Sequence, residues 1–309
     1  MDFVSTQVET LGNVIAQEII EQTYSRKHID AKIRKAIMDN PDMVAKLEQG
    51  VSLVNEWMHG TYYASKMARL EQLQALDIPE LVMDIFTGVA YILKPELFTS
   101  VSAQLASRLG FNDTATAILT VAEVLAVLCQ TDVFDITKEQ RQSSLMVVSL
   151  IPLPDALTKY MMISQYLPPM VCEPLEVTHN FSSGYLTHND TLILGSGNHH
   201  DGDICLDVIN KVNKIPLKLC TQFLSTVEEK PSFELDSQDK ITQWNEFKIQ
   251  SYEFYVLMVQ QGNRFYFTNK VDKRGRLYCQ GYHISTQSTA FKKAMIEFAE
   301  EELVNGVPD

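Results

Sequence analysis

The chain has 309 residues, with 26 Lys and Arg against 39 Asp and Glu, and a formal net charge of −13. With 45% hydrophobic and 21% charged residues, it has the composition of a globular protein of one large or two modest domains. Such an acidic chain is a poor candidate for general nucleic-acid binding, because phosphate binding needs concentrated Lys and Arg. No uncharged apolar run approaches the roughly 20 residues of a bilayer span, and the first residues lack the basic region of a signal peptide. We therefore expect no membrane association.

Residues 1–150 predict a helical domain, because apolar residues recur there at helical spacing. The pair Asn40 and Pro41 predicts a helix start, and Asp113 or Thr114 predicts an N-cap. The expected helices span residues 3–19, 29–38, 43–76 with interruptions near Gly50 and Gly60, 81–93, 98–109, 115–129 and 138–151.

The pattern changes at residue 151, where prolines become frequent. Residues 151–203 predict a loop-rich connector with short strands at 185–187 and 191–194. Residues 204–309 predict further helices with one strand-like run. The expected elements are helices at 204–227, 237–261 and 289–303 and a strand at 263–269. The predicted fold class is therefore mainly α with small β elements (α+β).

The five cysteines are scattered and form no Cys-x-x-Cys pair, which favours reduced thiols over disulfides or a zinc site. They are Cys129, Cys172, Cys205, Cys220 and Cys279. The adjacent pair His199 and His200 lies in a segment rich in Asn, Asp and Gly, which is typical of a surface turn. We predict no metal site and no catalytic residue in this chain.

A local basic cluster lies between residues 264 and 278. It contains five cations, one acid and four aromatic residues, which are Arg264, Lys270, Lys273, Arg274, Arg276, Asp272, Phe265, Tyr266, Phe267 and Tyr278. This combination suits phosphate neutralisation together with contacts to sugars or bases. Gly275 would let the backbone approach a ligand closely, and Asp272 could hold a neighbouring guanidinium. The alternative is a solvated turn between two strands. His283 could contact nucleic acid, or its imidazole could be packed or simply exposed. Lys292 and Lys293 could extend the basic face, or they could serve only as solvated residues of the last helix.

The order Asp-x-Arg-Gly-Arg-x-Tyr at residues 272–278 resembles the DxxGR motif of the single-subunit RNA polymerases, the phage and mitochondrial type. Further segments agree in order and spacing. Residues 169–174 and 183–185 resemble that family's PMVxxP…GGY stretch, and residues 208–224 resemble an Asn-containing helix, from which Lys214, Ile215 and Leu217 depart. Residues 246–267 resemble the helix and strand before DxxGR, and residues 290–302 resemble the helix after it.

The resemblance covers residues 166–303 and implies part of a right-hand polymerase: a helical N-terminal domain, the thumb and the first palm strands. In this family the catalytic aspartates, the nucleotide-binding Lys and Tyr and a His-Asp-Ser turn lie downstream of DxxGR, and the residues after Tyr278 hold none of these motifs. The chain thus resembles the small subunit of the heterodimeric RNA polymerases of N-four-group podoviruses.

The resemblance also implies partners. These are a large polymerase subunit that carries the catalytic aspartates and binds Mg²⁺, a DNA template, an RNA transcript and NTP substrates at the shared site. It allows for a phage single-strand-binding protein as a further partner, and it places the chain in the cytoplasm of an infected bacterial host.

The same resemblance assigns roles to the basic cluster. Arg276 would contact the template strand or the RNA–DNA hybrid, Gly275 would permit close approach, and Asp272 would orient the arginine. Lys273 and Arg274 would add backbone contacts; the predicted nucleic-acid-binding set is completed by Lys270 and Tyr278. Residues 237–261 would be a thumb element, although their apolar positions could equally form a core stripe.

Two other functions remain as alternatives. One is a helical phage DNA-binding transcription factor or adaptor that recruits another polymerase; it would bind DNA alone with steep salt dependence. The other is a structural or host-takeover protein whose resemblance is accidental.

Overall fold

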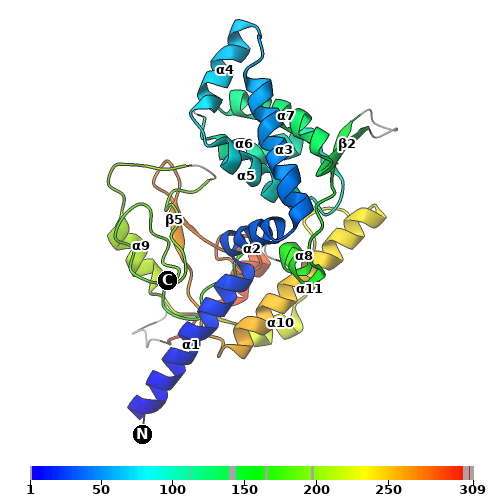
Figure 1. The fold of residues 1–309 in the computed structure, drawn as a ribbon. Helices are drawn as coiled ribbons and strands as arrows, with labels where there is room; N and C mark the ends of the chain where they lie inside the picture. Colours follow the sequence, from blue (N-terminus) through cyan, green and yellow to red (C-terminus); the bar gives the residue numbers. More distant parts are fainter. Residues whose placement is uncertain are drawn as a thin grey trace. The chain divides into compact units, whose positions relative to one another are not determined.

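The computed structural model describes residues 2–111, 113–138, 144–163, 166–195, 198–301 and 306 (Figure 1). The chain forms two compact units. Unit 1 combines Met1–His28 with Met162–Asp309, and unit 2 is the continuous segment Ile29–Met161. Helices dominate and the sheets are small, which confirms the predicted mainly α, α+β fold class.

Unit 2 is a helical body with one three-stranded antiparallel sheet. The boundary between the two units falls near the start of helix α2, between His28 and Ile29. The strand order of the sheet is β1-β3-β2. The helices are α2 (Arg26–Met38), α3 (Pro41–Met58), α4 (Ala64–Gln74), α5 (Ile78–Ala90), α6 (Phe98–Ala106), α7 (Thr114–Leu128) and α8 (Asp155–Ile163), and the strands are β1 (Glu96–Leu97), β2 (Phe134–Lys138) and β3 (Leu145–Ser149).

Side-chain caps start three of these helices. The side chain of Asn40 accepts hydrogen bonds from the N–H groups of residues 42 and 43, with Pro41 in the first turn of α3. Asp77 accepts from the N–H of Glu80 at the start of α5, and Asp113 accepts from that of Thr116 at the start of α7. The helix start predicted at Asn40 and Pro41 is confirmed, and of the two candidate N-caps, Asp113 and Thr114, it is Asp113 that caps α7.

The helix predicted over residues 138–151 is wrong. Residues 134–138 and 145–149 pair as antiparallel strands, with Phe134 opposite Ser149 and Lys138 opposite Leu145. Phe134 and Val147 are fully buried, so each of these strands contributes a side chain to the core of unit 2. Part of the predicted helix, residues 139–143, lies outside the described residues.

Helix α7 and the turn after it, Thr114–Thr131, form the one described stretch that is long and apolar enough to cross a membrane by length and composition. Its inward face belongs to the core of unit 2, where Val121, Val124, Leu125 and Leu128 are fully buried. A core helix has this composition for reasons of packing.

Unit 1 joins α1 to the C-terminal half of the chain. It contains two antiparallel strand pairs, β4–β7 and β5–β6. Its elements are α1 (Asp2–Tyr24), α9 (Leu206–Asn213), β4 (Leu217–Leu219), α10 (Thr221–Thr226), α11 (Gln238–Gln260), β5 (Asn269–Val271), β6 (Leu277–Cys279), α12 (Ala290–Ala294) and β7 (Ile296–Phe298).

The core of unit 1 lies between α1, α11 and the strands. Ile20 of α1 packs in one cluster with Phe254 and Met258 of α11 and with Phe265 and Phe267. Helix α11 confirms the helix predicted over residues 237–261. Its predicted stripe is mainly core: Trp244, Phe254, Tyr255 and Met258 are buried, and Ile241 and Phe247 are half-buried.

Five predicted elements of unit 1 are wrong in whole or in part. The helix expected at 204–227 is interrupted by β4, in which Leu217 and Leu219 are buried and Lys218 between them is not. The helix expected at 289–303 ends at Ala294 and gives way to β7, which pairs with β4. The strand expected at 263–269 shifts to β5. The run at 191–194 contributes one bridge, from Ile193 to Val271, and 185–187 forms no strand.

The compact units do not follow the expected boundaries at residues 150 and 203. Helix α1 belongs with the C-terminal segments because its inward face is bound there. Gln17 and Glu21 are fully buried, and they accept hydrogen bonds from the N–H groups of Val171, Leu186 and Thr187.

Candidate nucleic-acid interface

The DxxGR segment forms the turn of the β5–β6 hairpin. Lys270 lies opposite Tyr278, and Val271 lies opposite Leu277. The N–H of Asp272 donates to the carbonyl of Arg276 at 2.9 Å, and the N–H of Gly275 donates to the carbonyl of Asp272 at 2.9 Å. Gly275 has a φ of +80°, which is in the left-handed region that favours glycine. Open space surrounds its missing Cβ, so the backbone angle is what requires glycine here.

Asp272 is the hub of this turn. Its Oδ1 accepts hydrogen bonds from the N–H groups of Arg274 at 2.9 Å and Arg276 at 3.0 Å. Its Oδ2 accepts from Nε of Arg276 at 2.7 Å and lies 2.6 Å from Nη2 of the same guanidinium. The expected contact between Asp272 and an arginine is therefore present, and the arginine is Arg276.

The charge of Asp272 is stabilised by these donors. Desolvation of the carboxyl raises its pKa, but the backbone and guanidinium hydrogen bonds from Arg276 outweigh desolvation, so the pKa of Asp272 lies below its ordinary value. The carboxylate thus remains ionised and holds Arg276 throughout the neutral range.

The turn presents its cations to solvent. The side chain of Arg274 is 70% exposed and that of Arg276 is 53% exposed, whereas that of Asp272 is only 15% exposed. Lys273 is also exposed. The ring of half-buried Tyr278 lies beneath Arg276, with 5.5 Å between the guanidinium carbon and the ring centroid. The turn therefore offers three cations outward and keeps its one carboxylate internal.

The basic cluster does not extend along the whole of residues 264–278, and three of its four aromatic residues are not placed to contact a ligand at the surface. Phe265, Tyr266 and Phe267 are buried because this stretch crosses the core of unit 1. Arg264 is paired with Glu300 at 2.7 Å, away from the turn. Lys270 is mostly buried and ion-paired with Asp190, which favours an anchoring role over the predicted phosphate contact.

The segments that carry the resemblance converge on this hairpin. Met170 exchanges two backbone hydrogen bonds of 2.8 Å with Tyr266, just before β5. The N–H of Leu175 donates to the carbonyl of Gly184, whose φ is +74°. These bonds place residues 169–174 and 183–185 beside the chain that leads into the DxxGR turn.

Asparagine side chains tie helix α9 to the same region. The amide of Asn210 makes two hydrogen bonds with the backbone of Val177, at 2.8 and 2.9 Å. Asn269, the first residue of β5, donates to Oδ1 of Asn213 at 2.9 Å. Helix α9 thus supports the start of the hairpin.

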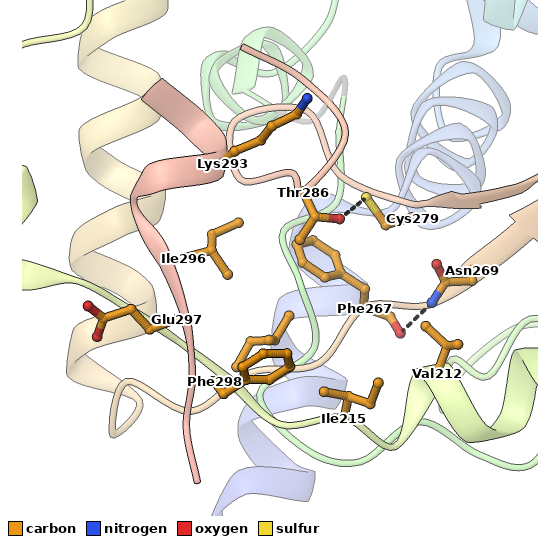
Figure 2. A pocket seen from close by; sticks show the side chains of 11 residues that line it. Val212, Ile215, Phe267, Asn269, Cys279, Thr286, Lys293, Ile296, Glu297 and Phe298 are labelled. Carbon is orange, nitrogen blue, oxygen red and sulfur yellow. Dashed lines mark hydrogen bonds between the residues drawn. The ribbon is translucent and has the colours of Figure 1, made fainter. Parts of the chain in front are cut away.

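A pocket of about 390 Å³ lies at the base of the hairpin. Figure 2 shows Ile296, Glu297 and Phe298 of β7 along one wall, and Asn269 and Cys279 of the hairpin on the opposite side. The hydroxyl of Thr286 donates to Sγ of Cys279 at 3.3 Å. The other lining residues are Val212, Ile215, Leu217, Phe267 and Lys293.

The sequence interpretation missed two residues that hold the hairpin, Asp190 and Gln287. The amide of Gln287 donates to the carbonyl of Leu277 and accepts from the N–H of Cys279, both at 2.9 Å. Both residues are ordinary surface types in loops, and no local pattern marks them, because their partners are set by tertiary structure.

Other candidate residues lie apart from the turn. His283 is buried rather than presented to a ligand, and Lys292 is buried against the rings of Phe247 and Tyr282. His199 and His200 are exposed. Within the described ranges, no group of three or more His, Cys, Asp or Glu side chains is placed to hold a metal ion.

Comparison with known proteins gives one distant relationship. No family model matches the chain. The chain is 28% identical to a protein named probable DNA-directed RNA polymerase, from Gelasinospora sp. (strain G114), over an alignment of 149 residues. The alignment covers 45% of this chain and 18% of that relative. The match supports a relationship to RNA polymerases, and the chain spans less than a fifth of the relative's length.

Proposed function

We propose that this chain is a non-catalytic subunit of a two-chain, phage-type DNA-directed RNA polymerase, and that the turn at residues 272–276 holds the template strand and the RNA–DNA hybrid. The observation that carries this proposal is the Asp272-centred turn, which presents Arg274 and Arg276 to solvent. The distant RNA polymerase relative supports the same direction.

The turn suits a nucleic-acid backbone. A guanidinium binds phosphate with two parallel hydrogen bonds, and orientation by Asp272 reduces the entropy that Arg276 loses on binding. Gly275 adds no side chain between the backbone and a ligand. Contacts of this kind position a nucleic acid without reading its sequence.

The net charge of −13 restricts such contacts to a small part of the surface. In the proposed complex only this part of the chain faces nucleic acid, and the partner supplies the rest of the positive channel. The steep electrostatic attraction of a wholly basic protein is then unnecessary.

Nucleotide addition by two metal ions requires carboxylates that hold both ions. We assign the catalytic aspartates, the Mg²⁺ ions and the NTP site to the large partner subunit, because in the family that the sequence resembles these motifs follow DxxGR. The proposed setting is the cytoplasm of an infected bacterium, where a phage single-strand-binding protein is a further proposed partner.

The test is transcription by the chain reconstituted with its partner. We expect the chain alone to incorporate no nucleotide and the Arg276→Ala complex to elongate about tenfold more slowly, the ratio for about 1.4 kcal/mol of lost charge-assisted hydrogen bonding. Arg264→Ala is the matched control, because Arg264 is an exposed, ion-paired arginine outside the turn. Its complex should retain normal activity.

Normal elongation by the Arg276→Ala complex would remove the assigned role. A chain that binds DNA tightly by itself, with a steep salt dependence and without a polymerase partner, would favour the transcription factor or adaptor instead.

A further inference from the structure

The free edge of strand β6 is covered by a side chain instead of a strand. Along the hairpin, the carbonyl of Arg276 accepts from the N–H of Asp272, just after β5, and the N–H of Gln280 donates to the carbonyl of Thr268, just before β5. Because backbone groups alternate direction along a strand, the carbonyl of Leu277 and the N–H of Cys279 point to the other edge. Gln287 bonds both of them.

The side-chain amide of Gln287 therefore makes the two hydrogen bonds that the backbone of a neighbouring third strand would make with β6. An amide is suited to this place because it carries a donor and an acceptor side by side, which a carboxylate or an aliphatic side chain lacks. Two-stranded hairpins are marginally stable, so a contact on the open edge matters to this one.

The loop that carries Gln287 is tied to the body of unit 1. The N–H of Gln287 donates to Oγ of Ser285 at 3.2 Å. In the same loop, His283 is buried and its Nδ1 lies 2.8 Å from Oγ of Ser251 on α11. Ile284 is buried in the core with Phe254. The position of Gln287 is thus set by α11 and the core.

The opposite edge of the hairpin is held as well. The N–H of Val271 donates to the carbonyl of Leu192 at 2.8 Å, and the N–H of Leu194 donates to the carbonyl of Val271 at 2.7 Å. Lys270 adds its ion pair with Asp190. With both edges of the hairpin held, the turn at residues 272–276 projects from a fixed base.

We propose that Gln287 is a positioning residue: its amide clamps the edge of β6 and thereby sets the direction in which Arg274 and Arg276 leave the turn. The link from these arginines to nucleic acid rests on the function proposed above. The clamp itself is independent of that function.

The first experiment measures the clamp by amide hydrogen exchange in the full chain. We compare the wild type with Gln287→Met, which keeps the length of the side chain and removes both hydrogen bonds, and with Gln287→Glu, which removes the donor. Gln222→Met, at an exposed glutamine of α10, is the matched control. Urea unfolding identifies any variant that fails to fold.

We expect at least tenfold lower protection of the amides of Gly275 and Arg276 in both Gln287 variants and no change in the control. Neither amide touches Gln287, since both are bonded to Asp272. Loss of protection confined to Cys279 would show a local contact without a positioning role and would overturn the inference.

The second experiment measures elongation by the reconstituted complex. Gln287→Met should lower elongation toward the level of Arg276→Ala, and the double variant should be slower than Arg276→Ala by less than the effect of Gln287→Met on the wild type, because the two changes share the contact of Arg276. If Arg276→Ala slows elongation but Gln287→Met does not, the positioning role is wrong. If the exchange result holds and Arg276→Ala has no effect, the clamp stands and the proposed function fails.

Discussion

At the scale of single residues, His283 is a buried group of unit 1 whose pKa lies well below its ordinary value. Its side chain lies among Phe247, Phe254 and Tyr282, and it is 4% exposed. Desolvation, and then the charge of Lys292, lowers the pKa of His283 to about 4. The imidazole is therefore neutral at physiological pH and serves packing, with Ser251 as its hydrogen-bond partner.

This burial predicts a pH dependence of stability. The folded-state pKa lies below the value of about 6.5 expected in the unfolded chain, so protonation favours unfolding. The stabilisation is fully present above pH 6.5 and is lost as the pH falls toward 4. A difference of about 2.5 pKa units corresponds to about 3 kcal/mol at most.

The measurement is urea unfolding of the wild type and of His283→Gln between pH 7.5 and 4. The difference between their free energies of unfolding should shrink by about 3 kcal/mol as the pH falls, because only the wild type gains a proton at this site. Carboxylates such as Glu229, close to Lys292, titrate in both proteins and cancel in the difference. Parallel curves would contradict the prediction.

The residue scale also separates what the sequence could predict from what it could not. The contact of Asp272 with a neighbouring arginine follows from a five-residue neighbourhood and is present. Gly275 was predicted for close approach to a ligand, and the structure gives it a further reason, its positive φ. The ion pair of Lys270 with Asp190 and the amide of Gln287 join distant parts of the chain. Those partners depend on the fold. The prediction from charge spacing therefore counted Lys270 as part of the basic surface, although its side chain is mostly buried.

At the scale of elements, helix α1 is held to unit 1 by a buried carboxylate. Glu21 is fully buried and accepts from the N–H groups of Leu186 at 3.0 Å and Thr187 at 2.8 Å. It also accepts from the hydroxyl of Thr187 at 2.6 Å and from the amide of Gln17 at 2.9 Å. Four donors converge on one side chain, which explains why α1 packs with residues far from it in sequence.

Glu21→Gln should destabilise unit 1 by about 3 kcal/mol, because the amide nitrogen would face donors and leave buried N–H groups without an acceptor. Glu18→Gln is the matched control: Glu18 is exposed on the same helix, and the change there should stay within about 0.5 kcal/mol. Urea unfolding followed by circular dichroism measures both. Equal effects of the two substitutions would show that the carboxylate of Glu21 does not anchor α1.

The helices were more predictable than the strands for a physical reason. Asn40, Asp77 and Asp113 cap helices through hydrogen bonds to residues two or three positions ahead, so the signal is local. Strands β4 and β7 have three residues each and exist because they pair with each other across most of the C-terminal segment. A strand of this length has too few residues to show a period of its own.

At the scale of the whole molecule, the chain forms two units. Unit 2 is continuous in sequence, and it is inserted in the sequence between the two segments that make up unit 1. Unit 2 is a single segment with its own helices, sheet and core. Unit 1 is assembled from both ends of the sequence, and α1 supplies Ile20 to its core. The sequence predicted a boundary at residue 150 because residues 1–150 are mostly helical and α1 fits that pattern. The hydrophobic pattern of α1 shows that one face is buried, but it does not show against which core.

The division predicts that the two units respond separately to core substitutions. Ile20 is 4% exposed in the core of unit 1, and Val121 is fully buried in the core of unit 2. Replacing either by alanine should cost about 2 to 4 kcal/mol through lost apolar contact and the cavity left behind. We expect Ile20→Ala to weaken unit 1, including residues 162–301, and Val121→Ala to weaken residues 29–161.

Hydrogen exchange read by mass spectrometry along a urea series can assign each loss of protection to peptides of one unit. In Ile20→Ala, peptides from α11 and the hairpin should lose protection at lower urea than in the wild type. Peptides from α5 and α7 should lose protection at the same urea concentration as in the wild type. Val121→Ala should give the reverse pattern, so each variant is the control of the other. If both substitutions shifted all peptides together, the chain would unfold as one cooperative body. Its discontinuous unit would then depend on the continuous one, and α1 would stabilise the molecule as a whole.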